Sequence, residues 1–488
     1  MRILTLLFLF LTNPLFASFQ MNERMQQSYT HIINLEFEAA NELLQIEKIE
    51  HPDNGILALH KNYIDFLTIL IGEEEEFFLA AKDLKSDRID FIQSGDDNSP
   101  YYLYAQAEVH LQWAFARLKF EEYLTAAYEI QKAYSLLEKN NEQFPNFKLN
   151  IKGLGLLHAL VGAIPEKYQW VLNLLSMDGG VELGLAELKS LIKDEEMEMY
   201  HSEIVFLTTF LQLNMTNNKI AYKLLLDEIG NEYSDNYLLN FAAVRLSHAL
   251  GENDFSIKVL QNRPDDHGKY PFHYLDYLQG MSYLYKLDYE KSQFFLNRFL
   301  NNFKGNNYIK SAYQKLAWIA FLKDEKDEKI SYLEKIKSEG RVFIDEDRAA
   351  LKEAVKNLIN SPRLLRARLL YDGGYYGKAQ LELASENKLL DYTGFFDEYY
   401  YRLARIESKL DYMDEQVITK YQKAFNLGKK STNYYAAMSA LQIGLIYEKE
   451  NKLNQAKIYF EKCLSLSDFD YERGIHQKAK VGLVRVTN

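Results

Sequence analysis

Apolar residues recur every three or four positions along the chain with polar residues between them, as in SPRLLRARLLYDGGYYGKAQLEL at 361–383. At this spacing Leu365, Leu369 and Leu370 share one face of a helix. The stretch lacks the alternation and the β-branched residues that are typical of a strand. The pattern therefore predicts amphipathic helices joined by short turns.

The helical pattern repeats along the sequence. Segments at 285–300, 371–383 and 447–466 align: each has an apolar or aromatic residue after a tight turn, a small residue three positions later and a large apolar residue four beyond that. These positions are Tyr289, Ser292 and Leu296 in the first segment, Tyr376, Ala379 and Leu383 in the second, and Leu453, Ala456 and Phe460 in the third. Such recurrence indicates a repeat architecture.

The last copy is the fullest, with Ile443, Gly444, Tyr447, Ala456, Phe460 and Cys463. It resembles the tetratricopeptide repeat, in which small residues mark close helix approach. In this register, repeats start near 202, 239, 273, 310, 360, 397 and 437, at intervals close to the roughly 34-residue period. Segments 37–52 and 123–133 fit the second half of a repeat. We expect an all-α protein, an α-solenoid of tetratricopeptide-like helix-turn-helix repeats.

The stretch YDGGYYGKAQ also resembles a phosphate-binding loop, and its residues argue against that interpretation. Such a loop needs four residues between its first glycine and the Gly-Lys pair, whereas Gly373 leaves three before Gly377. At the position where such a loop has a Ser or Thr to hold magnesium, this chain has Ala379. We expect Gly374 to lie in the turn between two helices, where a residue without a Cβ adopts a positive φ at little cost.

Residues 145–190 break the repeat and are rich in glycine. The segment resembles a signature of the tetratricopeptide repeat 39 and inclusion body clearance family, an apolar helix that opens with Gly and ends in Pro, followed by a second apolar helix and a Gly-containing turn. The matching residues are Gly155, Pro165, Gly179, Gly184 and Leu185. Ser176, Met177, Gly180 and Val181 depart from the family's turn. The resemblance implies a scaffold in protein or lipid homeostasis, with no catalytic residue.

The N-terminus, MRILTLLFLFLTNPLFAS, has the order of a secretory signal peptide. Arg2 precedes an apolar stretch, and Pro14 and the small residues Ala17 and Ser18 follow it. The apolar stretch is shorter than the roughly 20 residues that span a bilayer. We expect residues 1–17 to be removed and the mature protein to be exported, periplasmic or associated with the envelope.

Composition narrows the partners. The net charge is −12 and no basic stripe is visible, so nucleic acid is not expected as a partner, because affinity for phosphate backbones depends on clustered Lys and Arg. The only cysteine is Cys463, which excludes an internal disulfide. We expect a protein partner, with lipid or membrane contact as an open alternative.

Candidate chemistry is sparse. Asp265, Asp266, His267 and His273 supply enough donors for a metal, but nothing in the sequence fixes their geometry, and a polar loop between repeats is the preferred interpretation. The acidic run Glu73–Glu76 is typical of a solvated helix start. We expect no enzyme, no cofactor and no metal.

These patterns divide the chain into a signal peptide at 1–17, N-terminal repeats at 18–144, the glycine-rich segment at 145–200, central repeats at 201–359 and C-terminal repeats at 360–488. The function predicted first is an exported, non-catalytic scaffold that binds a protein partner in envelope assembly or homeostasis. The alternative is a carrier or sensor of hydrophobic ligands or lipids through residues 145–190.

Overall fold

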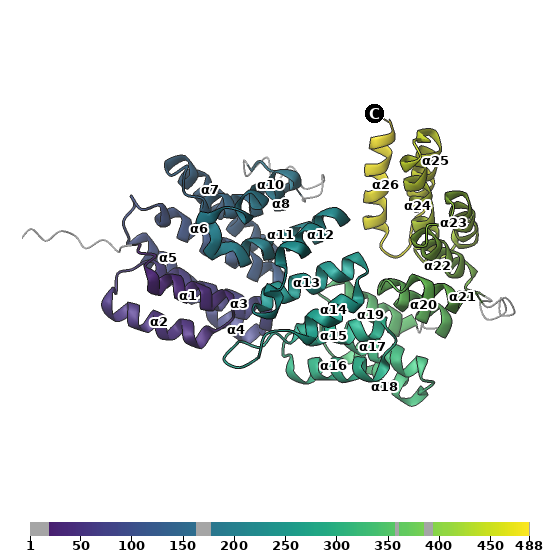
Figure 1. Cartoon of the computed structure of the whole chain (residues 1–488), viewed down its shortest axis with the longest axis horizontal. Coiled ribbons are helices and arrows are strands. Elements are labelled where there is room, and N and C mark those ends of the chain that lie inside the picture. The colour runs from purple at the N-terminus through teal and green to yellow at the C-terminus, as the bar shows by residue number, and fades with distance from the viewer. Residues whose placement is uncertain (1–18, 163–176, 357–360, 385–393, 488) are drawn as a thin grey trace, which may run out of the picture. The chain divides into compact units, whose positions relative to one another are not determined.

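The computed structural model describes residues 19–162, 177–356, 361–384 and 394–487 (Figure 1). These ranges consist of helices and turns and contain no β-strand. Their contacts divide into two compact units. The N-terminal unit contains the described residues through Ala249 together with Lys258–Asp276 and Phe299–Asn307; the C-terminal unit contains Leu250–Ile257, Tyr277–Arg298 and the residues from Tyr308 onward.

The N-terminal unit is built from neighbouring helices that pack in pairs: α1 with α2, α6 with α7, and α8 with α10. Its helices up to Ile229 are α1 (Glu23–Ile33), α2 (Phe37–Glu50), α3 (Ile56–Gly72), α4 (Glu75–Lys82), α5 (Leu84–Gln93), α6 (Pro100–Lys119), α7 (Tyr123–Gln143), α8 (Leu149–Gly162), α10 (Val181–Ile192), α11 (His201–Met215) and α12 (Lys219–Ile229). Ala40 and Leu44 on α2 are fully buried, as is Ala126 on α7. The two early repeat segments thus form helices whose small residues face a partner.

Helix α6 is buried on nearly every side, because α3, α5, α7 and α8 all contact it. Ser99 caps its start, and Pro100 occupies the first turn, where proline is tolerated. The buried residues include four polar ones, Gln106, Glu108, His110 and Gln112. A buried polar side chain is costly unless it is hydrogen-bonded, so this helix requires partners from other elements.

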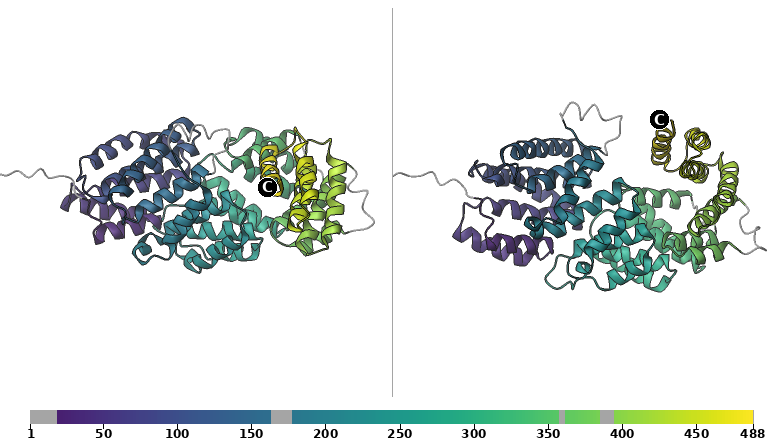
Figure 2. Two further views of the ribbon diagram at one scale, coloured as in Figure 1. Left: turned by 90° about the horizontal axis from the view of Figure 1, so that it is seen from above. Right: turned by 45° about the horizontal axis from the view of Figure 1, so that its top comes forward.

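The helices that begin each predicted repeat start within two residues of the expected positions. They are α11, α13 (Tyr237–Leu250), α15 (Tyr274–Tyr285), α17 (Ile309–Leu322), α20 (Pro362–Asp372), α22 (Phe396–Lys409) and α24 (Tyr435–Lys449). The second helices are α12, α14 (Asn253–Gln261), α16 (Tyr289–Asn302), α18 (Lys326–Ser338), α21 (Tyr376–Leu383), α23 (Asp414–Gly428) and α25 (Leu453–Leu464). The expected fold class, a tetratricopeptide-like α-solenoid, is confirmed. Figure 2 shows the helix pairs of the C-terminal unit in green to yellow.

The long interval between the repeats at 310 and 360 contains a further helix, α19 (Asp345–Lys356). The carboxylate of Asp347 accepts hydrogen bonds from the backbone N–H groups of Tyr308, at 2.7 Å, and Ser311, at 2.9 Å, at the start of α17. Glu353 accepts a hydrogen bond from the Trp318 indole at 2.6 Å. Helix α19 is therefore fixed to α17 at both its start and its second half. The chain ends with α26 (Glu472–Thr487).

The repeat signature marks close helix contacts. A Cβ at Gly444 would lie 2.6 Å from the Phe460 ring, and Ala456 and Phe460 are both fully buried. Tyr447 is half-buried and packs against the same core. In an earlier repeat the Ser292 hydroxyl donates to the Gly280 carbonyl at 2.8 Å. Small residues are needed here because two helices almost touch.

The glycines of the family-like segment also lie where backbones approach. Gly155 on α8 and Gly184 on α10 face each other, and a Cβ at Gly184 would overlap the Gly155 carbonyl oxygen. A Cβ at Gly179 would lie 2.7 Å from the carbonyl oxygen of His158. Pro165 lies outside the described residues. No helix in the described ranges is long and apolar enough to cross a membrane.

Gly374 lies in the turn between α20 and α21 with a φ of +81°. A Cβ there would overlap the carbonyl oxygen of Gly251, in the turn between α13 and α14. Nearby, the Asn253 amide donates to the hydroxyl of Tyr375, 122 positions along the chain, at 3.0 Å. Two turns of non-adjacent repeats are thus in direct contact within the C-terminal unit.

One detail of the acidic run differs from expectation. Glu73 is buried rather than solvated: it ends α3 in the left-handed conformation and forms an ion pair with Lys119 at 2.5 Å. It also accepts a hydrogen bond from the Asn307 backbone at 3.3 Å. Helix α4 begins only at Glu75. The segment boundaries at 144, 200 and 359 stay predictions.

Candidate functional site

Two groups of polar side chains are candidates for a site. The first is a buried charged cluster in the N-terminal unit, formed by Tyr29, Tyr63, Glu108, Lys152 and Glu203. Each comes from a different helix: α1, α3, α6, α8 and α11 in turn. We call this group the Lys152 cluster.

The Lys152 ammonium is at its centre and is surrounded by oxygens. It donates to the Tyr63 hydroxyl at 2.9 Å and to Glu203 at 2.9 Å, and lies 3.3 Å from Glu108. The hydroxyl of Tyr29 donates to Glu203 at 2.6 Å, and that of Tyr63 donates to Glu108 at 2.7 Å. Lys152 is only 1% exposed. The cluster is thus a buried network of charge-assisted hydrogen bonds.

Its protonation states are fixed near neutral pH. Burial alone would lower the pKa of Lys152, but Glu108 and Glu203 outweigh burial and raise that pKa to about 12. Burial, followed by the neighbouring carboxylates, raises the pKa of Tyr29 and of Tyr63 well above 10. A charged lysine and two protonated tyrosines neither give nor take protons readily at pH 7. The cluster therefore suits fastening five helices together more than catalysis.

The second candidate lies in the C-terminal unit and combines cations with aromatic rings. Trp318, Arg368 and Arg405 occupy the same position in the first helices of three successive repeats, α17, α20 and α22. Because the repeats stack, equivalent positions fall on the same side of neighbouring helices. The full set, which we call the arginine–tyrosine cluster, is Lys315, Trp318, Arg368, Tyr371, Tyr401, Arg405 and Tyr434.

Each cation in this cluster lies over an aromatic ring. The Arg405 guanidinium carbon is 4.0 Å from the Tyr371 ring centre and 5.5 Å from that of Tyr401. Arg368 lies 4.9 Å, and the Lys315 ammonium 4.4 Å, from the Trp318 ring. Such contacts stabilise a cation and hold it in a defined orientation.

The charges of these cations are only partly compensated. Among the described residues Arg405 makes no ion pair and no hydrogen bond, while Arg368 has one distant ion pair, 3.8 Å from Asp372. Lys315 hydrogen-bonds the neutral side chains of Ser311, at 3.2 Å, and Gln314, at 2.5 Å. Burial, and then the charge of Arg368, lowers the pKa of Lys315 to about 8.

Solvent reaches part of the cluster. The Arg368 side chain is 37% exposed, and Arg405, Tyr371 and Tyr434 are half-buried. Tyr434 packs edge-on against Tyr471, 5.6 Å between ring centres, and Tyr471 is 55% exposed. Asp470, the neighbour of Tyr471, forms an ion pair with Lys352 on α19. The loop before α26 thus borders the cluster and is fastened to α19.

The residues that the repeat pattern marked are packing residues and lie apart from these two clusters. Ala379 and Leu383 belong to the core between α20, α21 and α22. Lys378 is exposed, with its ammonium 5.3 Å from the Tyr375 ring. Neither cluster was identified from the sequence. The repeat register did contain one usable signal, the recurrence of arginine at the equivalent positions 368 and 405.

The loop considered as a metal site has other contacts. The Tyr237 hydroxyl donates to Asp266, and Asp265 accepts from the backbone of His267 at 2.9 Å. In the part of the chain that the structure describes, no three His, Cys, Asp or Glu side chains are grouped so as to hold a metal ion.

Repeated helical hairpins with small residues at their contacts define the class of protein, a tetratricopeptide-like α-solenoid. No family model matches the chain, and no curated protein does. Among solved structures, it is similar to the P58(IPK) TPR domain at 16% identity, covering 88% of this chain and 98% of that one, with a TM-score of 0.22. It is also similar to yeast Tom70 at 11% identity, covering 86% and 96%, with a TM-score of 0.23. At such TM-scores neither similarity carries an argument.

Proposed function

We propose that the protein is a non-catalytic scaffold that binds a protein partner through the arginine–tyrosine cluster. The observation that carries this proposal is Arg405, a half-buried guanidinium held between two tyrosine rings with no hydrogen-bond partner among the described residues. Arginine and tyrosine are enriched in protein interfaces, where they dominate the binding energy. The helices that carry them are packed into the unit, so the surface is formed before binding.

We place the mature protein outside the cytoplasm, in the periplasm or at the envelope, on the strength of the signal-like residues 1–17. In that location a scaffold without disulfides relies on burial for its stability, and the C-terminal unit provides it through continuous helix packing. A role in envelope assembly or homeostasis follows from location and partner together.

A carrier of hydrophobic ligands through residues 145–190 is the alternative. The apolar residues Leu154, Leu156 and Leu157 on α8 are buried within the N-terminal unit. Mass spectrometry of organic extracts from purified protein distinguishes the two functions. A stoichiometric lipid favours the carrier, and its absence favours the scaffold.

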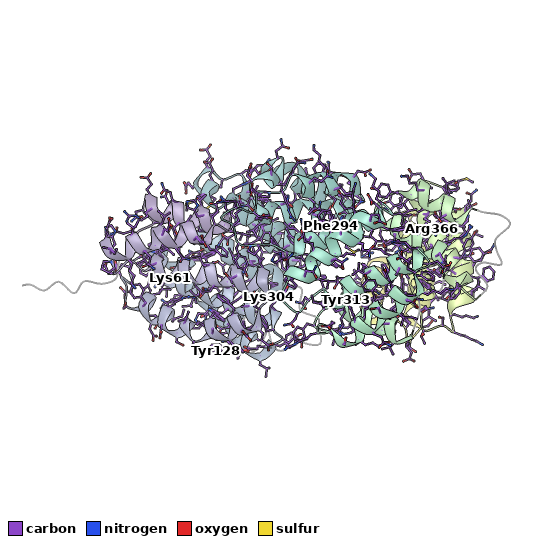
Figure 3. The ribbon with its side chains drawn as sticks, turned by 90° about the horizontal axis from the view of Figure 1, so that it is seen from below. Lys61, Tyr128, Phe294, Lys304, Tyr313 and Arg366 are labelled. Atoms are coloured by element: carbon purple, nitrogen blue, oxygen red, sulfur yellow. The ribbon has the colours of Figure 1, made fainter. Side chains whose placement is uncertain are left out.

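Photo-crosslinking in cells tests the scaffold directly. Tyr471, beside the cluster, is replaced by the photoreactive amino acid p-benzoylphenylalanine; the control is the same replacement at Tyr128 on α7, which is 60% exposed and labelled in Figure 3. We expect irradiation to join a discrete protein to position 471 and not to position 128. The proposal fails if neither position, or both equally, captures protein.

A further inference from the structure

We propose that the arginine–tyrosine cluster recognises an acidic segment of the partner, one in which aspartate or glutamate residues stand beside apolar or aromatic ones. This inference rests on the proposed function and specifies the partner's chemistry. It follows from charge, from the geometry of the guanidinium groups and from the rings around them.

The charge of the cluster is opposite to that of the chain. The protein has a net charge of −12, yet Lys315, Arg368 and Arg405 share one ion pair, at 3.8 Å, among the described residues. Asp372 and Glu353 attract these cations, but in the described part of the chain neither accepts a hydrogen bond from Arg368 or Arg405, so the charge is only partly compensated. Charge that is only partly compensated away from bulk water is unfavourable. A carboxylate between these groups would compensate it, and this surface therefore complements an anion.

The geometry favours a carboxylate. Tyr371 and Tyr401 lie near the guanidinium of Arg405 and restrict its orientation. Its N–H donors, which are arranged in a planar fork, have no acceptor in the described part of the protein. A fork of this kind matches the two oxygens of a carboxylate. Because the rings already hold the side chain, less conformational entropy is lost on binding.

Mutual repulsion within the cluster adds to this tendency. After burial, the charge of Arg368 contributes to the lowered pKa of Lys315. Burial and Arg402 disfavour the charged form of Arg368, although Tyr434, Asp372 and Glu353 outweigh them and raise the pKa of Arg368. Arg402 itself is paired with Glu398, at 2.6 Å. Among the described residues, the arginines of this group without a hydrogen-bonded carboxylate are thus Arg368 and Arg405. An anionic side chain placed there would relieve the repulsion as well as accept hydrogen bonds.

The surroundings distinguish a peptide from other anions. Tyr371 and Tyr434 are half-buried and offer aromatic surface next to the cations, which an apolar or aromatic side chain would cover, whereas Trp318 and Tyr401 are buried beneath. A nucleic acid or an anionic membrane instead presents an extended array of charges that the acidic remainder of the chain repels. A short acidic and apolar peptide satisfies both conditions.

The test uses the full mature chain and two fluorescent peptides. In the glutamate peptide, glutamate alternates with phenylalanine; in the glutamine peptide, glutamine replaces each glutamate. Binding is measured by fluorescence anisotropy. We expect the glutamate peptide to bind, its affinity to fall as salt is added, and the glutamine peptide to bind much more weakly. Arg405→Gln should weaken binding of the glutamate peptide by about 10- to 100-fold, the range for a charge-assisted hydrogen bond.

Arg348→Gln is the matched control, since Arg348 on α19 is 60% exposed outside the cluster and the charge change is identical. Circular dichroism of both variants establishes that each is folded, and Arg405→Lys, which keeps the charge and loses the fork, should bind with intermediate affinity. The inference is overturned if the two peptides bind equally, if neither binds, or if Arg405→Gln behaves as Arg348→Gln does.

Competition separates the sources of negative charge. Inorganic phosphate, a single-stranded oligonucleotide or anionic vesicles should each displace the peptide less effectively than unlabelled peptide does. More effective displacement by any of them overturns the inference. A crosslinked protein at position 471 without binding of the glutamate peptide would leave the scaffold function standing and the acidic partner rejected, whereas absence of the crosslink would reject the scaffold function itself.

Discussion

The turn at Gly374 lies against the turn at Gly251, so closely that a side chain at 374 would overlap the carbonyl oxygen of 251. In an ideal solenoid each repeat contacts only its neighbours. Here two non-adjacent repeats touch, and Asn253, Tyr375 and Asp254 continue the contact with hydrogen bonds of 3.0 and 2.8 Å. The C-terminal unit therefore has a link across repeats in addition to nearest-neighbour packing.

Gly374→Ala should break this link. The new Cβ would overlap Gly251, and the φ of +81° is unfavourable for alanine, so we expect a loss of at least about 1 kcal/mol in the free energy of unfolding, measured by urea denaturation. Gly377→Ala is the control, because nothing lies within 4 Å of a Cβ at Gly377 on α21. It should leave stability unchanged or raise it by up to about 1 kcal/mol. Equal effects would contradict the prediction.

Substitutions at the two residues after Gly377 distinguish a helix contact from a nucleotide-binding site. Lys378 is exposed, so Lys378→Ala should change stability by less than about 0.5 kcal/mol. Ala379 is fully buried between helices, and Ala379→Leu should cost roughly 1–3 kcal/mol. We expect faster hydrogen exchange across the described parts of 361–440 in Ala379→Leu. Calorimetry should detect no ATP or GTP binding by the wild type, and micromolar binding that Lys378→Ala abolishes would contradict this interpretation.

Removal of the Lys152 charge should destabilise the N-terminal unit. Lys152→Met leaves the buried carboxylates of Glu108 and Glu203 without their cation, which typically costs about 3–5 kcal/mol. Hydrogen exchange should rise in α1, α3, α6, α8 and α11 together. Lys223→Met, at a lysine that is 53% exposed, serves as control and should have little effect.

The same lysine predicts sensitivity to alkali. Its folded pKa of about 12 is above the unfolded value of 10.5. Its contribution is therefore complete below about pH 10.5 and is lost as pH rises towards 12. Unfolding of the wild type should become easier over this window, and Lys152→Met should show a smaller change. Parallel pH profiles would contradict the assignment.

Asp347 predicts that stability also depends on pH in the acidic range. Burial raises its folded pKa to about 6, above the value of 3.8 expected in the unfolded chain. A raised pKa contributes stability that is complete below pH 3.8 and is lost as pH rises through 6. Relative to Asp347→Asn, wild type should therefore gain roughly 2 kcal/mol in the free energy of unfolding between pH 7 and 4. Urea denaturation at several pH values measures this, and a constant difference would count against it.

The location of the protein is tested at its N-terminus. If residues 1–17 are a cleaved signal, sequencing of the native protein should begin near Ser18. Fractionation should recover that shortened chain outside the cytoplasm. Intact Met1 in the cytoplasmic fraction would contradict export.

The repeats could be predicted from the sequence because they depend on local spacing. The recurrence of small residues and turns predicts where the first helices of the repeats, from α11 to α24, begin. The same register predicts that Gly374 lies in a turn between two helices. Helix α19 was not anticipated, since an insertion between repeats has no register of its own. The Lys152 cluster could not be inferred, because Tyr29 and Glu203 are 174 positions apart. The arginine–tyrosine cluster also depends on how successive repeats are rotated, which spacing alone does not determine.

The Lys152 cluster has a consequence for synthesis of the chain. The ribosome produces Tyr29, Tyr63 and Glu108 before Lys152, and all four before Glu203. Until residue 203 emerges, Tyr29 and Lys152 lack one of their acceptors and are better hydrated than buried. We therefore expect the N-terminal unit to complete its folding late. For much of its synthesis the nascent chain should stay accessible to chaperones.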